Sequence, residues 1–483
     1  MSAPNTYLRL PTTAWFLIAL GLLTCLGTAN PAFTMASLMS LVFFITLLWR
    51  KGEPPVLFFA IAFQWLQVSI KIFHANFMGF TLADMFGDTD IEKAITLSLS
   101  GLAVLGLGMR FGLINFKGTR EQKIKDEIKH FSVKKIWVVY LFTFIASLVF
   151  KGLIWKIPPL TQILLAAFNL KWAVFYLLAY TIIAKRIGAY FLILAVLMEV
   201  IVGVTGFFSD FKQVFFVLFV VMWTVGYRMT PKNTIRTLAI AVLVFFMGVV
   251  WTSVKTEYRK FVSDETGQQV TLVSYNERLS KIIDLSLSID SERLTKGVEK
   301  LAERIAYVDM FANVLNYVPD VMPHENGALW KKSIMHILAP RIFFPNKPVL
   351  ESDSELTMKY TGLQMASGQQ GTSISIGYMA ESYIDFKIPG MFIPIFILGI
   401  LWGGMYRYFI RRSRTKIFGY AIAVAVLIQA NQFEIHNTKL VGGMLMSFIV
   451  MGLVQKFGIP VISQWVLIGR EKNVAGITQE KLC

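Results

Sequence analysis

Twelve apolar runs constrain the fold of this chain more than any other feature of its sequence. Each is long enough, in some cases with tilt or a few polar residues, to cross about 30 Å of hydrocarbon. The runs are Trp15–Ala29, Phe33–Trp49, Val56–Ile72, Ile95–Met109, Ile136–Phe150, Ile163–Ala184, Ile187–Val204, Val214–Tyr227, Ile235–Val254, Ile388–Tyr406, Ile417–Ala430 and Leu440–Leu453. Only 16% of the residues are charged, against about 25% in soluble domains, which excludes an ordinary soluble enzyme. The sequence predicts an all-α polytopic membrane protein with about 12 transmembrane helices.

Basic residues gather in every second connection between these runs. These connections hold Arg50 and Lys51, residues 110–135, Lys185 and Arg186, residues 228–236, and residues 407–416. With the N-terminus inside, every basic cluster faces the cytosol, and so do both termini. The longest connection, Lys255 to Lys387, holds 15 Lys and Arg against 17 Asp and Glu, so the net charge of +17 lies elsewhere. The basic balance therefore indicates topology and no nucleic-acid partner.

The longest connection also divides the chain. We expect a membrane bundle of about nine spans at 1–254, an extracytoplasmic loop at 255–387, a bundle of about three spans at 388–458, and an interfacial segment with a cytosolic tail at 459–483. Ile459–Ile468 is too short to span the bilayer. Apolar residues recur three or four apart in the first half of the loop, at Leu279, Ile282, Ile283, Leu301, Ile305 and Val308. This period predicts amphipathic helices on the outer face.

Motifs of soluble enzymes and metal sites are missing from the sequence. It contains no CxxC, HExxH, P-loop or GxSxG pattern. His324 and His336 share the long loop, but their spacing matches no recurrent metal motif. We therefore expect neither a metal nor another cofactor.

The stretch Pro340 to Pro348, PRIFFPNKP, combines two cations, paired aromatics and three prolines that restrict the backbone. Arg341 and Lys347 are suited to bind a phosphate group at the membrane interface, with Phe343 and Phe344 in lipid or in an apolar groove. A proline-rich interfacial turn with snorkelling cations explains the same composition equally well.

Two later segments carry candidate acids and bases. In TSISIGYMAESYIDFKIPG, Thr372 to Gly390, the carboxylates of Glu381 and Asp385 are four residues apart and share one face of a helix. Either could accept a proton from a sugar hydroxyl, although acids at a helix start commonly stabilise the helix dipole. His436 lies in the polar segment QANQFEIHNTK and could serve as acid or base, or belong to an ordinary loop.

Other charged residues are weaker candidates. Lys212 in GFFSDFKQ, Arg278 and Arg304 belong to the outer connections, where most such cations form solvated faces or surface ion pairs. Lys171 and Glu199 fall inside predicted spans, where an ionised side chain is costly. Their similar depth and opposite sign predict that they pair with each other across adjacent helices.

A long outer loop that ends in PRIFFPNKP and is followed by TSISIGYMAESYIDFKIPG resembles the Wzy-type oligosaccharide repeat-unit polymerases of bacterial envelopes. Those proteins also have about a dozen spans, one large late extracytoplasmic loop, and basic residues before and inside it. GFFSDFKQ looks like their Gly-rich segment that ends in a cation, with Lys212 where Arg is more usual. The resemblance has motif support from Gly203 to Gly390 and covers the first 200 residues only in hydropathy.

The resemblance implies a glycosyltransferase of the bacterial inner membrane with an extracytoplasmic active face. Its substrates would be glycans linked through pyrophosphate to undecaprenyl, joined by metal-independent glycosyl transfer, and a chain-length regulator is an additional conceivable partner. By the same resemblance, Arg341 and Lys347 would bind pyrophosphate, with Arg278, Arg304 and Lys212 as secondary ligands. Glu381 is the first candidate base, followed by His436 and Asp385.

Three other classes of function remain open on the sequence. An O-antigen-type ligase would transfer a finished glycan to a different acceptor. A transport protein is the second class. A flippase of lipid-linked glycans would use the same charges to bind head groups and would need a central cavity open alternately to both sides. A secondary transporter would place its ionisable residues near the bilayer midplane, where Lys171 and Glu199 are the only hints. A non-catalytic assembly protein could use the long loop as a docking surface.

Overall fold

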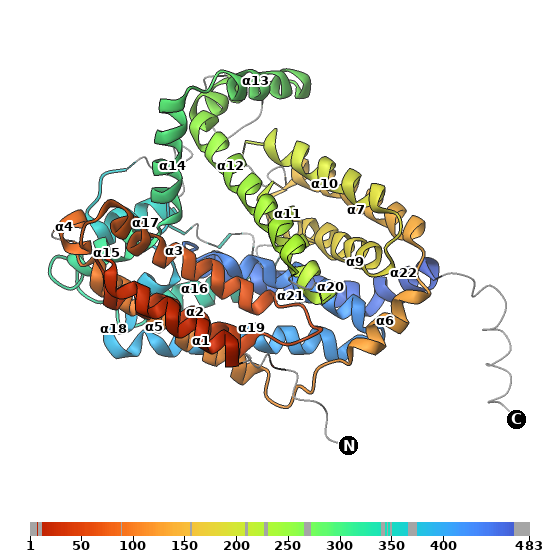
Figure 1. Cartoon of the computed structure of the whole chain (residues 1–483), viewed down its shortest axis with the longest axis horizontal. Helices are drawn as coiled ribbons and strands as arrows, with labels where there is room; N and C mark the ends of the chain where they lie inside the picture. Colours follow the sequence, from red (N-terminus) through yellow and green to blue (C-terminus); the bar gives the residue numbers. More distant parts are fainter. Residues whose placement is uncertain are drawn as a thin grey trace, which may run out of the picture.

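The computed structural model of the whole chain describes residues 7, 12–87, 89–154, 157–207, 211–226, 230–264, 272–339, 343–344, 346–347, 350–365 and 374–467 (Figure 1). Regular secondary structure in these residues is helical, and their β-type pairings are two isolated bridges. The predicted all-α class is therefore confirmed for the part of the chain that the structure describes.

Eight helical segments of the described chain are long and apolar enough to cross a membrane. They are α2 (Pro31–Leu48), α3 (Val56–Met78), α5 (Ile91–Gly112), α7 (Val133–Leu153), α8 with α9 (Thr161–Phe168 and Leu170–Lys185), α12 (Pro231–Val262), α19 (Phe392–Arg412), and α21 with α22 (Asn437–Leu453 and Ile459–Val466). Each overlaps a predicted span. The chain thus has the helices of a membrane-spanning protein.

The other four predicted spans form shorter apolar helices. These are α1 (Thr12–Thr24), α10 (Ala189–Val204), α11 (Lys212–Thr224) and α20 (Lys416–Leu427). At 1.5 Å per residue, a helix of 16 residues covers about 24 Å, less than the hydrocarbon core. Helix length therefore supports eight membrane crossings, and twelve crossings stay a prediction of the sequence.

Glycines set the closest helix packing in the bundle, between α5 and α19. Gly108 and Gly112 of α5 lie four residues apart, as do Gly399 and Gly403 of α19. A Cβ atom at any of these positions would overlap backbone atoms of the opposite helix. Small residues at this spacing let two helix backbones approach closely in a membrane. The glycine pairs thereby fix α19, which follows the site-bearing segment, against the N-terminal bundle.

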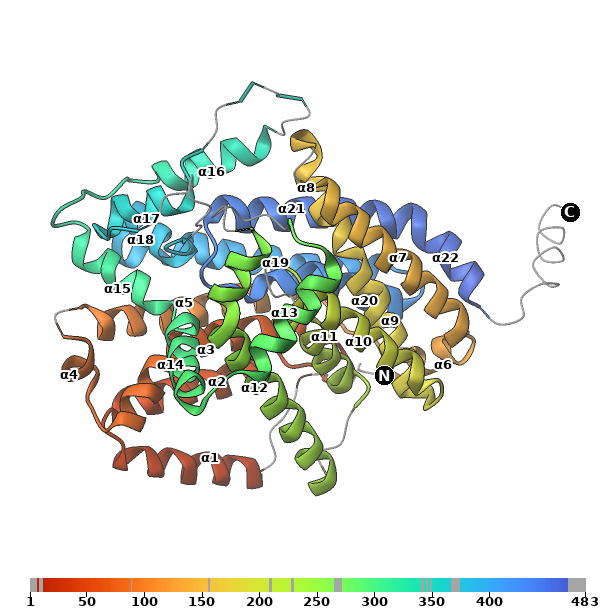
Figure 2. The same cartoon turned by 90° about the horizontal axis from the view of Figure 1, so that it is seen from above.

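The predicted extracytoplasmic segment is helical, and its first helix is the continuation of the preceding span. Helix α12 continues to Val262, eight residues beyond the predicted span end at Val254. Figure 1 shows α12, α13 (Tyr275–Leu287) and α14 (Ser291–Ile305) projecting together from the bundle, and Figure 2 gives the view from above. We name this unit the α12–α14 arm. It encloses a small apolar core that consists of Phe211, Trp251, Val254, Tyr258, Val262, Ile282 and Leu285.

The sequence explains why the arm helices begin where they do. Ser274 and Glu277 form a reciprocal capping box at the start of α13. The Asp290 side chain accepts a hydrogen bond from the Arg293 backbone N–H at the start of α14. Between these caps the apolar residues recur at helical spacing, so the predicted amphipathic helices are present.

Helices of the second half of the loop lie against the bundle. They are α15 (Val308–Tyr317), α16 (Ala328–Leu338), α17 (Asp353–Thr361) and α18 (Tyr378–Gly390), and the remaining short helices are α4 (Leu82–Phe86) and α6 (Glu121–Lys129). Lys71 of α3 and Asp309 of α15 form an ion pair at 2.7 Å, which ties α15 to the bundle. The second half of the loop is thus a packed layer.

Two helix ends in the C-terminal part differ from the span ends expected from the sequence. The span expected from Ile388 begins at Phe392, because the chain kinks at Lys387, whose φ is +56°. Ile459–Ile468 was expected to be a separate interfacial segment. In the structure, a π-helical turn at Val454–Gly458 joins α21 to α22 in one apolar helical stretch, Asn437–Val466, and the interfacial placement of its last part stays a prediction.

Candidate functional site

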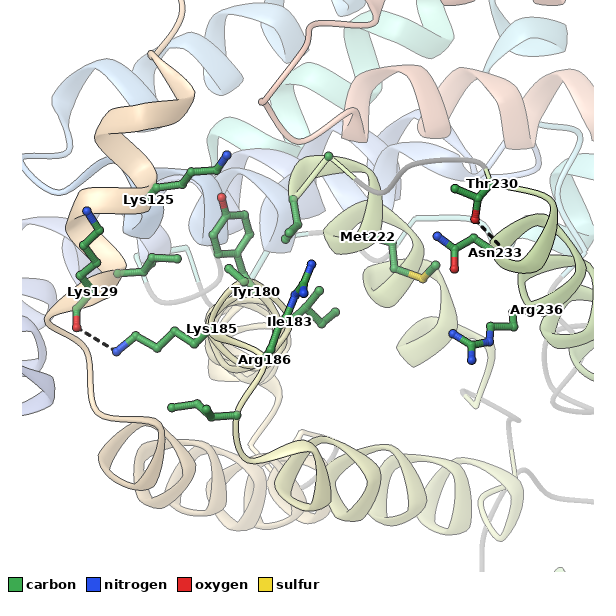
Figure 3. Close-up of a pocket in the computed structure, with 15 residues that line it drawn as sticks. Lys125, Lys129, Tyr180, Ile183, Lys185, Arg186, Met222, Thr230, Asn233 and Arg236 are labelled. Atoms are coloured by element: carbon green, nitrogen blue, oxygen red, sulfur yellow. Dashed lines mark hydrogen bonds between the residues drawn. The ribbon is translucent and has the colours of Figure 1, made fainter.

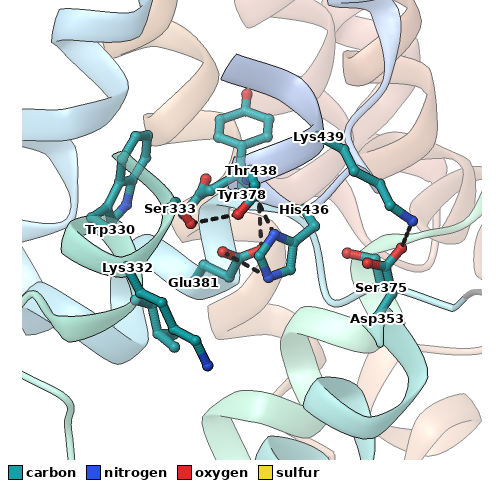
Figure 4. Close-up of polar contacts among 12 residues, drawn as sticks. Trp330, Lys332, Ser333, Asp353, Ser375, Tyr378, Glu381, His436, Thr438 and Lys439 are labelled. Atoms are coloured by element: carbon teal, nitrogen blue, oxygen red, sulfur yellow. Dashed lines mark hydrogen bonds and ion pairs between the residues drawn. The ribbon is translucent and has the colours of Figure 1, made fainter. Parts of the chain in front are cut away.

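A buried carboxyl group lies where α18 meets the start of α21. Glu381 of α18 is completely buried, and its Oε1 accepts a hydrogen bond from the backbone N–H of Asn437 at 3.1 Å. Its Oε2 lies 3.6 Å from Nε2 of His436 and has no hydrogen-bond partner among the described residues. Figure 4 shows the two side chains facing each other. A buried carboxyl oxygen without a partner is uncommon and marks a functional candidate.

The backbone determines which ring nitrogen of His436 carries the proton. His436 is the N-cap of α21, and its Nδ1 accepts a hydrogen bond from the Thr438 backbone N–H at 3.1 Å. The neutral ring therefore carries its proton on Nε2, the atom that faces Glu381. The His436 side chain is 14% exposed, whereas Glu381 is not exposed at all.

Burial acts on both groups in the direction that removes charge. It raises the pKa of Glu381 well above the ordinary value, and the negative charges of Asp353 and Asp385 act in the same direction. It also lowers the pKa of His436 to about 4. The carboxyl group therefore holds its proton more tightly than a solvated glutamate. Once ionised, it is a stronger base than a solvated carboxylate.

Two lysines flank this pair. Figure 4 shows Lys332 of α16 on one side and Lys439 of α21 on the other. Lys439 forms an ion pair with Asp353, and Lys332 lies 3.6 Å from Glu351; their side chains are 57% and 51% exposed. Half-exposed ammonium groups beside a buried carboxyl group can bind an anionic part of a substrate.

Residues of α3 hold the polar segment before His436 in place. Gln67 donates to Glu434 at 2.7 Å and accepts from the Phe433 backbone N–H at 3.1 Å. Gln64 donates to the Ala430 carbonyl oxygen and accepts from the Tyr378 hydroxyl, each at 2.7 Å. The polar segment that was predicted to be either a loop or a site is therefore fixed to both α3 and α18.

Asp385, the third candidate base, has a different position. Its Oδ1 and Oδ2 accept hydrogen bonds from the backbone N–H groups of Leu329 at 3.1 Å and Trp330 at 2.7 Å. These donors belong to the first turn of α16, so Asp385 satisfies and stabilises that helix start. Burial nevertheless raises its pKa. The geometry therefore favours a structural role for Asp385, which stabilises the N-terminal end of α16.

The predicted phosphate ligands do not all come together. Arg341 lies outside the described residues. Lys347 is described, and its Nζ donates to the His336 carbonyl oxygen in the last turn of α16 at 3.0 Å. Phe343 and Phe344 of the same stretch are exposed. Lys347 thus occupies the C-terminal end of α16, and Lys332 lies on the same helix.

The other three predicted cations belong to the α12–α14 arm and its contact with α11. Arg278 donates to the Thr205 carbonyl oxygen at 3.1 Å, at the end of α10. Lys212 begins α11 directly after Phe211, a member of the arm's apolar core. Arg304 is exposed near the C-terminus of α14. The contacts of Arg278 and the positions of Lys212 and Arg304 thus belong to the arm and its neighbours α10 and α11.

Tyr307 connects the two regions. It directly follows the last turn of α14, and its hydroxyl oxygen accepts from the Ser375 backbone N–H at 3.2 Å. Burial raises its pKa to about 12, and charges of both regions act on it, Arg304 from the arm and Asp353 from the site. The basic arm and the Glu381 site are therefore neighbours rather than one cluster.

The predicted pair inside the membrane bundle is present. Lys171 Nζ lies 2.7 Å from Glu199 Oε2, and both side chains are about 5% exposed or less. The Tyr140 hydroxyl donates to the second carboxylate oxygen of Glu199 at 3.1 Å. The pair joins α9, α10 and α7, so its evident role is to stabilise the bundle.

The sequence did not single out Lys332, Lys439 and Asp353. Lys439 ends the polar segment that contains His436, which was a usable signal. The other two residues belong to solvated stretches of α16 and α17, and only the fold brings them beside Glu381. Within the described residues, no group of three or more His, Cys, Asp or Glu side chains is placed to hold a metal ion.

Comparison with known families places this chain in one of them. A family model described as a domain of unknown function, DUF8712, matches residues 55–463. The chain belongs to the DUF8712 family. No curated protein and no solved structure matches the chain. The DUF8712 match runs from the residue before α3 to within α22, so it includes every residue of the Glu381 site.

Proposed function

We propose that this DUF8712 protein is a membrane glycosyltransferase that joins undecaprenyl-pyrophosphate-linked oligosaccharide repeat units at the outer face of the bacterial inner membrane. In this proposal the chain crosses the bilayer twelve times, with both termini in the cytosol. The C-terminal end of α12, helices α13 to α18 and the start of α21 lie on the extracytoplasmic side. The sequence resemblance and the Glu381 site support this function independently.

The unpartnered Oε2 of Glu381 carries the proposal. In the reaction, an acceptor hydroxyl group loses its proton to Oε2 while its oxygen forms a bond to the anomeric carbon of the donor glycan. The bond from that carbon to the diphosphate oxygen breaks, and the electron pair leaves with undecaprenyl pyrophosphate. A carboxylate whose pKa is raised by burial is suited to take up this proton.

Positive charge stabilises the departing diphosphate in this scheme. Lys332 and Lys439 lie on either side of Glu381 and are half exposed, so they can exchange their carboxylate partners for phosphate oxygens. Arg341 and Lys347 are proposed as further ligands from the proline-rich stretch. Cations fixed near a leaving group stabilise the charge that develops there without a metal ion.

Access to Glu381 requires a movement of His436. The carboxyl group is fully buried, and the partly exposed imidazole is the side chain that faces Oε2. We propose that the acceptor displaces this ring and takes its place next to the carboxyl group. His436 then regulates access, and its Nε2–H remains near enough to donate to the bound glycan.

Reconstitution tests the proposal directly. The full chain, incorporated into liposomes with undecaprenyl-pyrophosphate-linked repeat units, is expected to form a ladder of longer glycans. Glu381→Gln keeps the size and the Asn437 contact of the side chain but removes the base, so the rate should fall by about 10²–10⁴. The matched control is Glu299→Gln on the exposed surface of α14, which should polymerise at the wild-type rate.

The products separate this function from its alternatives. Wild-type chain formation by Glu381→Gln would remove Glu381 from the mechanism. Transfer of a finished glycan to another acceptor, without a ladder, would indicate the ligase. If wild-type protein leaves the lipid-linked repeats chemically unchanged and moves them between leaflets, the protein is a flippase or transporter.

A further inference from the structure

A second candidate site lies among helix ends remote from Glu381 in the chain. A cavity of about 1230 Å³ opens between α6, the end of α9, the end of α11 and the start of α12. Figure 3 shows Lys125 and Lys129 on one side, Lys185 and Arg186 in the middle, and Arg236 on the opposite side. The positive-inside pattern predicts that these helix ends face the cytosol.

The cavity is strongly basic. Five of its fifteen lining residues are Lys or Arg, and none is Asp or Glu. Lys125 and Lys129 form ion pairs with Glu121 and Asp126 of their own helix, at 2.6 and 2.8 Å. Among the described residues, no carboxylate forms an ion pair with the other three cations, Lys185, Arg186 and Arg236. The residues that line the cavity therefore carry a net positive charge, and Glu121, which pairs with Lys125, lies beside the lining residue Gly226.

Lys185 cannot easily turn away from this region. Its Nζ donates to the Lys129 carbonyl oxygen at 2.9 Å and to the Phe131 carbonyl oxygen at 2.6 Å. These bonds anchor its ammonium group beside α6 without neutralising it. Arg186 follows as the left-handed C-cap of α9 and is exposed. Two guanidinium groups, of Arg186 and Arg236, thus remain available for an anion, and guanidinium binds phosphate oxygens in bidentate geometry.

The walls between these cations are apolar. Ile128, Ile183, Met222 and Val225 line the cavity, together with Ile187, which is 53% exposed. Beyond the rim, the exposed faces of α10 and α12 are also apolar, with large side chains at Tyr190, Ile193, Ile235 and Leu238. A small soluble anion gains no binding energy from apolar side chains, whereas the acyl chains of a lipid can pack along them.

We propose that this cavity binds the phosphate headgroup of an anionic phospholipid of the cytosolic leaflet. Arg186 and Arg236 hold the phosphate, Lys185 adds positive charge, and the acyl chains follow the apolar faces of α10 and α12. Basic pockets between transmembrane helices on the cytosolic side are suited to such headgroups. The site is independent of glycosyl transfer and would exist whatever reaction Glu381 performs.

Titration of the purified full chain with lipid tests this site. Phosphatidylglycerol is added to the protein in a neutral detergent, and bound lipid is counted by native mass spectrometry. Phosphatidylcholine tests the charge requirement, and glycerol 1-phosphate tests whether the headgroup alone suffices. Each cation near the surface contributes roughly fivefold in affinity for an anionic lipid. The double substitution Arg186→Gln with Arg236→Gln should therefore weaken phosphatidylglycerol binding about 30-fold.

Two matched variants exclude trivial explanations. Arg411→Gln with Arg412→Gln removes two exposed arginines at the end of α19, outside the cavity, and should bind phosphatidylglycerol like wild type. Arg186→Lys with Arg236→Lys keeps the charges and should retain most of the affinity, which separates loss of charge from misfolding. Unchanged binding by the double glutamine variant would overturn the site. Equal binding of phosphatidylcholine would overturn the anionic preference, and equally tight binding of glycerol 1-phosphate would overturn the lipid as the ligand.

Discussion

The ion pair between Lys171 and Glu199 offers the sharpest test of how the membrane bundle is held together. We consider Lys171→Met and Glu199→Gln, singly and combined. Methionine preserves most of the lysine volume, and glutamine still accepts the hydrogen bond from Tyr140. The double variant replaces two buried charges with two neutral side chains of similar shape, so the packing of α7, α9 and α10 is largely retained.

The structure sets the expected size of the effect. At about 4 Å, two unit charges attract each other by about 4 kcal/mol at the effective dielectric constant of a protein interior. Removing one partner of a buried pair costs about 3–5 kcal/mol, because the other charge stays buried without compensation. Replacing both Lys171 and Glu199 removes the cost of burying two charges together with the attraction between them. We therefore expect each single variant to lose about 3–5 kcal/mol and the double variant to lose about 1 kcal/mol or less.

The assay is reversible unfolding of the purified protein in mixed micelles of increasing SDS content, followed by circular dichroism. The double-mutant cycle yields the coupling free energy between the two side chains, expected at about 5 kcal/mol or more. A coupling below about 0.5 kcal/mol would refute the reasoning, because the observed contact at 2.7 Å would then contribute nothing to the stability of the bundle.

Two further predictions follow from other contacts. Gly403→Leu should destabilise the protein by about 3 kcal/mol, because a Cβ atom there would overlap the Met109 carbonyl oxygen. The control is Gly404→Leu, since nothing lies within 4 Å of a Cβ atom at that position. Unfolding in SDS compares the stability of the two variants. In a Glu381→Gln background, acid should destabilise the fold, because the unfolded chain protonates His436 near pH 6.5 while the folded chain resists protonation down to about 4. Unfolding followed from pH 7 to 4 should therefore show the Glu381→Gln protein losing up to about 3 kcal/mol more stability than the Glu381→Gln, His436→Gln double variant.

Hydropathy was sufficient to locate the membrane helices because the bilayer imposes one requirement on every span. The residues at which the helices begin and end were less predictable. The kink at Lys387 and the π-helical turn at Val454–Gly458 depend on tertiary packing, which hydropathy does not report. The pairing of Lys171 with Glu199 was predictable for the same reason as the spans. Ionised side chains in hydrocarbon need a partner, and the sequence offered only one of opposite sign at that depth.

The sequence was enough to pick out Glu381 and Asp385 as candidates but not to assign a role to each of them. Glu381 and Asp385 are four residues apart on one helix, and nothing local distinguishes a base from a helix cap. The distinction comes from contacts more than 50 residues away in the chain, where Asn437 meets Glu381 and the start of α16 meets Asp385. Lys332 and Asp353 escaped prediction because isolated charges in polar helices are common, and only tertiary packing brings them to the site.

The polar side chains of α3 show how one long apolar helix can organise the Glu381 site. Gln64, Gln67 and Lys71 recur three and four residues apart, so they form one buried stripe on an otherwise apolar helix. Gln64 and Gln67 bind the segment before His436, and Lys71 binds Asp309 of α15. A purely apolar face would span the bilayer equally well, so spanning does not account for the stripe. Because the same helix binds both α18, through Tyr378, and the segment before His436, it holds the backbones that carry Glu381 and His436 in register while the imidazole ring can still turn.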